Sequence, residues 1–423
     1  MKKAAIATAV LASITTLAAA ADPLPADFAK NSPTFRGANG SGLTNFKNLP
    51  TSWKEGEKNI LWKTKIPLPG WSCPIVWGDK VIAMGANAET RAVYCLDAKT
   101  GKPLWTTKAP ADEKATADYA VDSMDQRWDI LLYAGATPAT DGKKVFAAFS
   151  NGQLIALDLA DGKVAWKVAL GDTADNTYGL DNSLLIYGKT VIVVFEGGTQ
   201  YIAAFDAATG KQVWKTERES ATWASPILIK TKAGKYQVVL PADPDVTAWD
   251  PENGKKLWSV EVLTGGPEYC VGPSPVYAAD TVCVNCQNCG IYGIDPVAGK
   301  KVWGLEELPD GSGFPDGTSM ATDGKHIYQY FSYSLTCIDA KTGKVVAQKE
   351  MDDEANYASP AVNNGTLYLF GGMGATMVKA DPKANFADVG KGEIDDMSDA
   401  APAIVDGKIF IRSDDAVYCI GSK

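Results

Sequence analysis

The chain has 423 residues, 46% of them hydrophobic, so it is long enough to bury a sizeable core. It carries 50 acidic and 41 basic side chains, which give a formal net charge of −9 at pH 7. A chain this acidic repels nucleic acid and anionic lipid, which argues against both as partners.

Residues 1–21 are predicted to be a signal peptide. Lys2 and Lys3 precede an apolar, alanine-rich run that ends in small residues, which is the order of a cleavable secretory signal. The run is too short and too rich in alanine to indicate a membrane span, and no later stretch reaches that length. Loss of the two lysines takes the formal charge from −9 to −11. We therefore expect a soluble mature protein, periplasmic or secreted, in a compartment where disulfides can form.

Residues 22–58 are expected to form an extended arm, and a sequence repeat fills residues 59–423. The most complete copy reads AFDAATGKQVW, with Asp206, Gly210 and Trp214. A short strand is expected to end at the aspartate, whose side chain can accept a hydrogen bond from a backbone N–H two residues on. The glycine can take the positive φ that such a turn needs. The repeat aspartates are Asp97, Asp158, Asp206, Asp250, Asp295 and Asp339, with Asp381 in a weaker copy.

The tryptophan of each copy lies eight residues after the aspartate, on the following strand. A large ring at one constant place per repeat can bury against the neighbouring unit and set its angle. Spacings of 42–61 residues between successive aspartates suit a four-stranded propeller blade, as in WD40/YVTN-like repeats. The rings predicted to dock neighbouring blades are Trp62, Trp105, Trp166, Trp214, Trp258 and Trp303.

Eight copies of a second marker precede the repeats: a small residue, often followed by proline, and then an alternating apolar strand. The tetrapeptide AVYC occurs at 92–95 and again at 416–419, so the last strand corresponds to the third strand of the first blade. The strand NILWKTK near the N-terminus supplies the missing strand, because residues 62–64 match residues 214–216. We therefore predict an all-β, eight-bladed β-propeller of four-stranded blades, closed by an N-terminal strand that completes the last blade.

The repeat resembles that of the pyrroloquinoline-quinone-like (PQQ-like) propellers, whose pattern is roughly A-x-D-x-x-T-G-x-x-x-W. The copy from Ala204 to Trp214 fits every position, and the match spans about residues 59–423. This family includes quinoprotein alcohol dehydrogenases, the BamB-type outer-membrane assembly lipoprotein and many secreted proteins of unknown role. The segment FRGANGSG at 35–42 is similar to the lead-in arm of the secreted group. Its glycines do not indicate a phosphate-binding loop, because no Gly-Lys-Ser or Gly-Lys-Thr follows them.

The segment CVNCQNC at 283–289 places three cysteines at three-residue intervals. Alignment of the repeats puts it in the hairpin between the second and third strands of one blade, at the same end as Cys270, so that three or all four of these cysteines are expected on one rim. The favoured interpretation is a structural disulfide, such as Cys270 with Cys286 or Cys289, because a secretory compartment oxidises close thiols. A metal site that adds Cys283 to these three is the weaker alternative, and buried thiols are the third. A c-type haem is excluded, because it needs CxxCH.

The predicted loops between blades are strongly acidic and are expected to share one face of the propeller. They contain 24 Asp or Glu residues against 4 Lys or Arg. Such a face could dock cations or a basic partner, whereas the plainer interpretation is that the loops are polar and solvated. The loops are 111–130, 170–182, 217–222, 263–271, 305–317, 350–357 and 391–399.

The starts of the first strands are expected to line the central channel on this acidic face. Trp71, Trp223 and Tyr357 occupy matching positions there, and Asp181 and Asp399 lie nearby in the sequence pattern. Aromatic rings beside carboxylates could hold a small ligand at the channel mouth. The alternative is that these rings pack beneath the loops.

Two functions are compatible with these features. The sole histidine, His326, begins a strand, which argues against a catalytic triad, and no HExxH or EF-hand-like sequence occurs. The favoured function is a non-catalytic, monomeric scaffold that binds a protein or small-molecule partner without a cofactor. No cysteine follows the signal peptide before Cys73, so the lipid anchor of the assembly lipoproteins is not expected. The alternative implied by the resemblance is a dehydrogenase using PQQ and calcium, although that branch's adjacent cysteine pair is absent and its Glu-Asn-Asp calcium set matches no motif.

Overall fold

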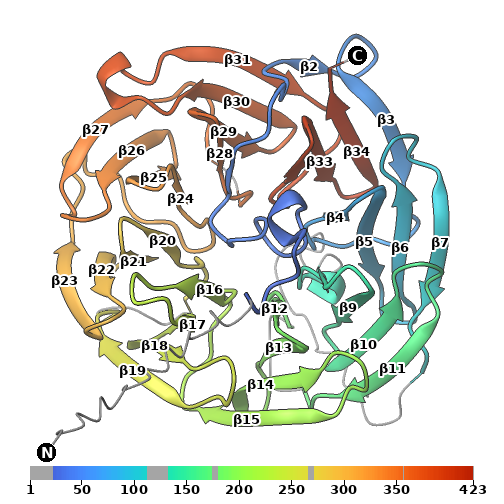
Figure 1. Ribbon diagram of the computed structural model, residues 1–423. Helices are drawn as coiled ribbons and strands as arrows, with labels where there is room; N and C mark the ends of the chain where they lie inside the picture. The colour runs from blue at the N-terminus through green and yellow to red at the C-terminus, as the bar shows by residue number, and fades with distance from the viewer. Residues whose placement is uncertain (1–21, 112–131, 174–179, 265–270, 356, 423) are drawn as a thin grey trace, which may run out of the picture.

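The computed structural model describes residues 22–111, 132–173, 180–264, 271–355 and 357–422. Almost all of their regular structure is β-strand, apart from three short 3₁₀ turns, η1 (Phe28–Lys30), η2 (Leu132–Ala134) and η3 (Pro382–Ala384). The described strands form eight sheets arranged around a common axis (Figure 1). The molecule is therefore an all-β propeller.

The first six sheets are antiparallel meanders of four strands, and the strand order in each follows the chain. The first two sheets are β4 (Ile75–Trp77), β5 (Lys80–Ala86), β6 (Arg91–Asp97) and β7 (Pro103–Lys108), then β8 (Ala139–Thr140), β9 (Lys144–Ala148), β10 (Gln153–Asp158) and β11 (Val164–Ala169). The next two are β12 (Leu185–Tyr187), β13 (Thr190–Phe195), β14 (Gln200–Asp206) and β15 (Gln212–Arg218), then β16 (Ile227–Lys230), β17 (Tyr236–Ala242), β18 (Asp245–Trp249) and β19 (Lys256–Glu261). The fifth and sixth are β20 (Val276–Ala278), β21 (Thr281–Cys286), β22 (Gly290–Asp295) and β23 (Lys300–Leu305), then β24 (Ala321–Thr322), β25 (His326–Phe331), β26 (Ser334–Asp339) and β27 (Val345–Glu350).

Part of the predicted arm belongs to the seventh sheet. β1 (Leu43–Thr44) pairs in parallel with the first strand of this sheet, and β2 (Trp53–Lys54) pairs in parallel with the fourth. In Figure 1 this blue segment runs from the centre of the ring to its rim. The arm therefore covers both edges of one sheet. The four strands between β1 and β2 are β28 (Ala361–Asn363), β29 (Thr366–Gly371), β30 (Gly374–Lys379) and β31 (Asp388–Glu393).

The eighth sheet joins strands from the two ends of the domain. β3 (Ile60–Lys65) pairs antiparallel with β34, with Trp62 opposite Cys419 and Thr64 opposite Val417. The third sheet has the same register: Trp214 lies opposite Ala204, which is two residues before the turn aspartate Asp206. β3 therefore takes the place of a fourth strand in the eighth sheet. The other strands of the sheet are β32 (Ala403–Val405), β33 (Lys408–Arg412) and β34 (Ala416–Gly421).

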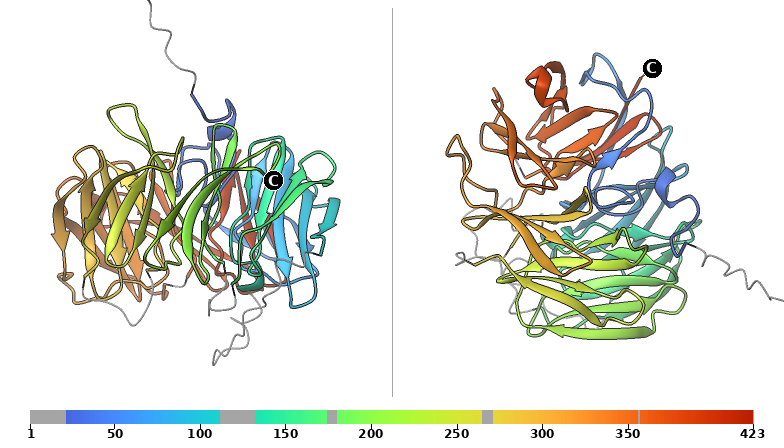
Figure 2. Two further views of the ribbon diagram at one scale, coloured as in Figure 1. Left: turned by 90° about the horizontal axis from the view of Figure 1, so that it is seen from below. Right: turned by 60° about the vertical axis from the view of Figure 1, so that its left-hand side comes forward.

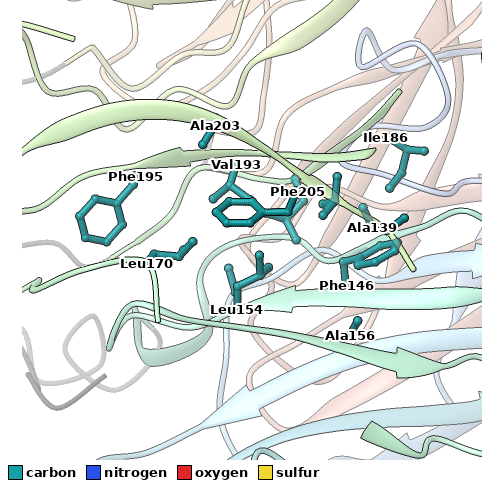
Figure 3. Packing of buried hydrophobic residues seen from close by; sticks show 14 of the residues in the cluster. Ala139, Phe146, Leu154, Ala156, Leu170, Ile186, Val193, Phe195, Ala203 and Phe205 are labelled. Carbon is teal, nitrogen blue, oxygen red and sulfur yellow. The ribbon is translucent and has the colours of Figure 1, made fainter. Parts of the chain in front are cut away.

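Apolar side chains fill the space between neighbouring sheets. Phe146 and Leu154 from the second sheet and Val193 and Phe205 from the third belong to one buried cluster (Figure 3). Each of these four side chains is at most 3% exposed. Because the second and third strands of each sheet are packed on both faces, they are apolar almost throughout, as β13 (TVIVVF) is.

The repeat aspartates other than Asp158 accept backbone N–H bonds in the turns that precede the fourth strands. The Asp97 carboxylate accepts from the backbone N–H groups of Lys99 at 3.1 Å and Thr100 at 2.7 Å. Gly101 then takes φ +70°, which a residue with a side chain rarely adopts. The turn thus needs the aspartate as a hydrogen-bond acceptor and the glycine for its positive φ.

The repeat tryptophans hold neighbouring sheets together through these same turns. Trp62 Nε1 donates to Ala98 O at 3.2 Å, and a Cβ added to Gly101 would lie 2.6 Å from the Trp62 ring. Glycine is therefore required for the close contact as well as for the turn. The same tryptophan-on-glycine contact is made by Trp105 on Gly162, Trp166 on Gly210, Trp214 on Gly254, Trp258 on Gly299 and Trp303 on Gly343.

The arm enters the central channel from one face of the ring. Figure 2 shows η1 on that face, outside the layer of sheets. Farther along the arm, Ser32 bridges to Val76, and Pro33 O accepts from the Thr140 N–H at 3.0 Å. The channel is therefore filled by the arm on this side. None of the helical turns in the described ranges is long and apolar enough to cross a membrane.

Candidate ligand site in the central channel

A ring of hydrogen bonds connects the residues that stand just before the first strands. The backbone N–H of Cys73 donates to Thr137 Oγ1 at 3.1 Å. The ring continues from Thr137 to Ser183 (3.2 Å), Ser183 to Ser225 (2.9 Å), Ser225 to Ser274 (2.9 Å), Ser274 to Ser319 (2.9 Å) and Ser319 to Ser359 (3.1 Å), each backbone N–H donating to the next hydroxyl. The eighth position is Ala401, which has no hydroxyl and interrupts the ring. We call these eight residues the hydroxyl ring.

The residues two positions before the hydroxyl ring form a second layer in the channel. Because side chains of an extended chain alternate, residues two apart point to the same side. This layer contains all five predicted channel-mouth residues, and its members are Trp71, Gly135, Asp181, Trp223, Gly272, Gly317, Tyr357 and Asp399. Asp181 and Asp399 are thus equivalent to the aromatic residues in the repeat, whereas the sequence pattern had placed them only nearby.

The two layers line one cavity of about 210 Å³. Trp71, Trp223, Tyr357, Asp181 and Asp399 all contribute to its wall, so the structure brings the predicted residues together. The three glycines of the second layer allow neighbouring atoms to approach closely: a Cβ at Gly272 would lie 2.0 Å from Asp316 O, and one at Gly317 would lie 3.0 Å from the Tyr357 ring.

Two further lining residues were missed in the sequence. Phe35, from the arm, and Asp316, one residue before the second layer, both line the cavity. Phe35 has no equivalent in the repeat, so no repeat alignment could find it. Asp316 could have been found from its place beside Gly317, a second-layer position.

The aromatic residues are held by the loops that precede the first strands. The backbone N–H of Trp71 donates to Ala134 O at 3.2 Å, and the backbone N–H of Trp223 donates to Val271 O at 2.9 Å. Trp71 and Tyr357 meet edge to face, with ring centroids 5.8 Å apart. Tyr357 remains 37% exposed, so part of the aromatic wall is accessible.

Asp181 is the most unusual carboxyl group of the cavity. Its Oδ1 atom is buried without a hydrogen-bond partner, and a Cβ on Gly135 would lie 1.8 Å from it. Burial raises the pKa of Asp181 to about 8, so the group is largely protonated at pH 7. Together with Asp316 and Asp399 it supplies three carboxyl groups, and none of the described lining residues is a lysine or arginine.

The CVNCQNC segment forms the predicted hairpin but not the predicted cysteine cluster. A disulfide joins Cys286 and Cys289, whose Cα atoms are 5.1 Å apart. The proposed partner Cys270 lies outside the described residues. Cys283 does not join Cys286 and Cys289, because it is three residues from Cys286 on β21 and packs on the opposite face of the sheet.

Cys283 is buried among apolar residues, away from the disulfide of Cys286 and Cys289, and Cys270, the fourth member of the candidate metal site, lies outside the described residues. In the ranges that the structure describes, no group of three or more His, Cys, Asp or Glu side chains could hold a metal ion.

Several acids of the predicted acidic face already have partners. Asp353 accepts from Lys391 Nζ at 2.9 Å and from Thr376 Oγ1 at 2.6 Å. Asp310 accepts from Ser334 Oγ at 2.6 Å and from Ser312 Oγ at 2.7 Å. Part of the acidic face therefore stabilises its own loops. Residues 112–131, 174–179, 265–270 and 356, which belong to these loops, lie outside the described residues.

The comparisons with known proteins agree with this architecture. The PQQ_2 family model, described as outer membrane protein assembly factor BamB, matches residues 52–201 and 198–423. The chain belongs to this PQQ-repeat family. The resemblance seen in the sequence is thereby confirmed.

This PQQ-repeat chain is similar to enzymes and to an assembly factor alike. It is 26% identical over 168 residues to quinohemoprotein alcohol dehydrogenase ADH-IIG of Pseudomonas putida, which is 38% of this chain and 21% of that protein. It is 24% identical over 230 residues to outer membrane protein assembly factor BamB of Burkholderia pseudomallei, 51% of this chain and 52% of that protein. The chain thus spans about a fifth of the dehydrogenase and about half of the assembly factor.

Among solved structures, a europium-containing methanol dehydrogenase matches with a TM-score of 0.69 at 15% identity, covering 91% of this PQQ-repeat chain and 90% of that chain. At this level of identity the likeness shows the fold alone.

Proposed function

We propose that this chain is a periplasmic or secreted binding protein that takes a small organic cation in the channel cavity and has no catalytic role. In this proposal the eight sheets are the blades of one closed propeller, and the acidic loops attract the cation. The observation that carries the proposal is the cavity wall, in which two further acidic side chains, Asp316 and Asp399, accompany the protonated Asp181 and four aromatic rings, beside no described lysine or arginine.

The chemistry of the wall favours a cation. Aromatic faces attract an organic cation by about 0.5–2 kcal/mol each, depending on how far it is desolvated. Asp316 and Asp399 supply negative charge, and the hydroxyl ring offers small polar groups at the floor. The cavity, at about 210 Å³, is below the roughly 300–1,000 Å³ of pockets for drug-sized ligands. A compact ammonium compound therefore suits it better than a large one.

A PQQ- and calcium-dependent dehydrogenase is the second candidate, because relatives of that class are among the matches. The quinone carries three carboxylic acid groups, which would meet the carboxyl groups of Asp181, Asp316 and Asp399 with no described lysine or arginine between them. The described residues also supply no group of three acidic, histidine or cysteine side chains for a calcium ion. The described residues do not fit this cofactor pair, and we derive no reaction step through it.

Thermal unfolding of the mature protein separates the two candidates. Choline is the cationic probe, 3,3-dimethylbutan-1-ol is its uncharged counterpart, and PQQ with Ca²⁺ is the third addition. We expect a saturable rise in the unfolding midpoint with choline, because a ligand at 100 times its dissociation constant adds about 2.7 kcal/mol. The uncharged alcohol should have little effect. A saturable rise with PQQ and Ca²⁺ alone would instead support the dehydrogenase.

Cavity variants provide the matched control. Asp399→Asn removes one charge from the wall and should reduce the choline effect. Asp406→Asn removes an exposed charge that does not line the cavity and should leave the effect unchanged. Equal loss in both variants would point to general electrostatics and not to binding in the cavity.

A further inference from the structure

The guanidinium group of Arg36 is buried on the arm side of the hydroxyl ring. The residue is 4% exposed. Its Nη2 donates to Ser41 O at 3.2 Å, to Pro360 O at 3.4 Å and to Met320 O. Its Nε and Nη1 have no hydrogen-bond partner. A buried charged group with unused donors is unfavourable unless something accepts from them.

The arm is shaped closely around this group. Arg36 has φ +57°, a left-handed conformation that residues with side chains rarely adopt. Gly42, the last glycine of FRGANGSG, has φ +70°, and a Cβ there would lie 2.9 Å from Pro360 O and 3.3 Å from Arg36 Nη2. Gly42 is therefore needed for the arm to fold closely around the guanidinium.

A small cavity adjoins the guanidinium where the hydroxyl ring is interrupted. It measures about 10 Å³, and Arg36, Ser359 and Ala401 are among its lining residues. This is room for about one water-sized species. Because Ala401 has no hydroxyl, the Ser359 N–H lacks the acceptor that each preceding member of the ring has. The cavity is thus bordered by a buried cation and by a backbone donor.

No carboxylate among the described residues neutralises Arg36. Burial lowers the pKa of Arg36 only to about 9, so it stays protonated at pH 7, and Cys73 is the one titratable group whose charge would act on it. Burial also raises the pKa of the Cys73 thiol to about 11, so that the thiol is uncharged. By contrast, the buried Arg412 has the nearby carboxylates of Asp414 and Asp396.

We propose that this cavity binds one monatomic anion, chloride being the abundant one outside the cell. The anion accepts from one of the unused Arg36 donors, Nε–H or Nη1–H, and from the Ser359 N–H, and it neutralises the buried guanidinium. It also completes the contacts of the hydroxyl ring at the position of Ala401. In this way the anion fastens the arm to the seventh and eighth sheets. This site is separate from the proposed cation cavity and does not depend on it.

The first test is denaturant unfolding of the mature protein in sodium chloride, bromide and gluconate at one ionic strength. We expect chloride and bromide to stabilise the protein with saturation, raising the folding equilibrium constant about 100-fold at 100 times the dissociation constant. Gluconate is too large for the cavity and should have no such effect. Equal midpoints in the three salts would overturn the proposal and leave a water molecule as the occupant.

Two conservative variants make the test specific. Ala401→Ser adds a hydroxyl that can accept from the Ser359 N–H and fill the cavity, so the chloride effect should disappear. Ser274→Ala opens the hydroxyl ring at a position that does not line the Arg36 cavity, so the chloride effect should persist. A chloride effect of equal size in Ala401→Ser and the wild type would contradict the proposal, because it would be a general salt effect.

Crystals grown in bromide give a direct readout. Bromide scatters anomalously, and a peak is expected within hydrogen-bonding distance of Arg36 Nη1 or Nε. Diffraction that shows no anomalous peak there, with Arg36 placed as described, would also overturn the proposal.

Discussion

Asp181 and Arg36 are buried titratable side chains that lie near the hydroxyl ring. Asp181 is in the wall of the larger cavity, and Arg36 borders the smaller one. Both have buried polar atoms without a partner. Proteins seldom retain such groups without compensation, and in this molecule each of them points to a ligand.

Asp181→Asn should change how stability depends on pH. The pKa of Asp181 rises from 3.8 to about 8 on folding, so the folded state holds a proton that the unfolded state releases. Stability from this group is therefore present below pH 4 and is lost as the pH rises toward 8. The asparagine variant lacks this loss, so its stability relative to the wild type should increase between pH 5 and pH 9.

Denaturant unfolding at several pH values measures this difference, and the exposed substitution Asp406→Asn is the control. Parallel pH profiles for Asp181→Asn and the wild type would show that the carboxyl group is not protonated in the folded protein.

At this scale the sequence predicted one of the two groups. Asp181 was selected because it lies near aromatic residues that recur at one place in the repeat. Arg36 was not selected, because the arm has no counterpart in the repeat and its partners Met320 and Pro360 are 284 and 324 positions away. No local pattern reports such distant contacts.

The elements that connect neighbouring sheets are the turn from aspartate to glycine and the tryptophan that packs on it. Trp214 is 8% exposed, its Nε1 donates to Pro251 O at 3.1 Å, and its ring covers Gly254. One tryptophan thus contributes apolar burial and a hydrogen bond to the adjacent sheet. These contacts lie within the repeat, and for this reason they could be predicted from spacing alone.

Trp214→Ala should destabilise the protein by about 3–5 kcal/mol, as expected for a large buried aromatic residue. Gly254→Ala should also destabilise it, because the new Cβ would lie 2.4 Å from the Trp214 ring in a backbone of φ +71°. Gly234→Ala is the matched control, since Gly234 has φ +75° but nothing within 4 Å of a Cβ. Denaturant unfolding should therefore rank Gly254→Ala well below Gly234→Ala in stability; equal values would mean that the ring contact is unimportant.

The cysteines show that the position of a hairpin does not by itself give the direction of its side chains. Repeat alignment located the hairpin correctly, but it did not consider that residues three apart on a strand face opposite sides. Applying that alternation to Cys283 and Cys286 would have separated them in advance. The identity of the bonded pair, Cys286 with Cys289, still required the turn geometry.

At the scale of the whole molecule, β3 and β34 bring the two ends of the domain into one sheet. If this pairing closes the ring, residues 416–421 should be as protected from hydrogen exchange as the strands of the third sheet, residues 190–206. The reason is that closure leaves no terminal sheet able to open independently. Rapid exchange confined to β3 and β34 would indicate an open ring.

The fold was predictable because one pattern recurs along most of the chain, so each copy supports the others. The path of the arm was not, since residues 43–44 and 53–54 pair with strands more than 300 positions away. The lining of the cavity was predictable only in part. Its two layers come from the repeat, whereas Phe35 comes from the arm.

Calorimetric titration of the mature protein with choline tests the central proposal, that the channel cavity is a cation site, most directly. We expect saturable binding with one site, no comparable binding of 3,3-dimethylbutan-1-ol, and at least about tenfold weaker binding in Trp223→Ala, which corresponds to about 1.4 kcal/mol. Binding of the uncharged alcohol as tightly as choline, or no binding of choline by the folded protein, would contradict the proposal.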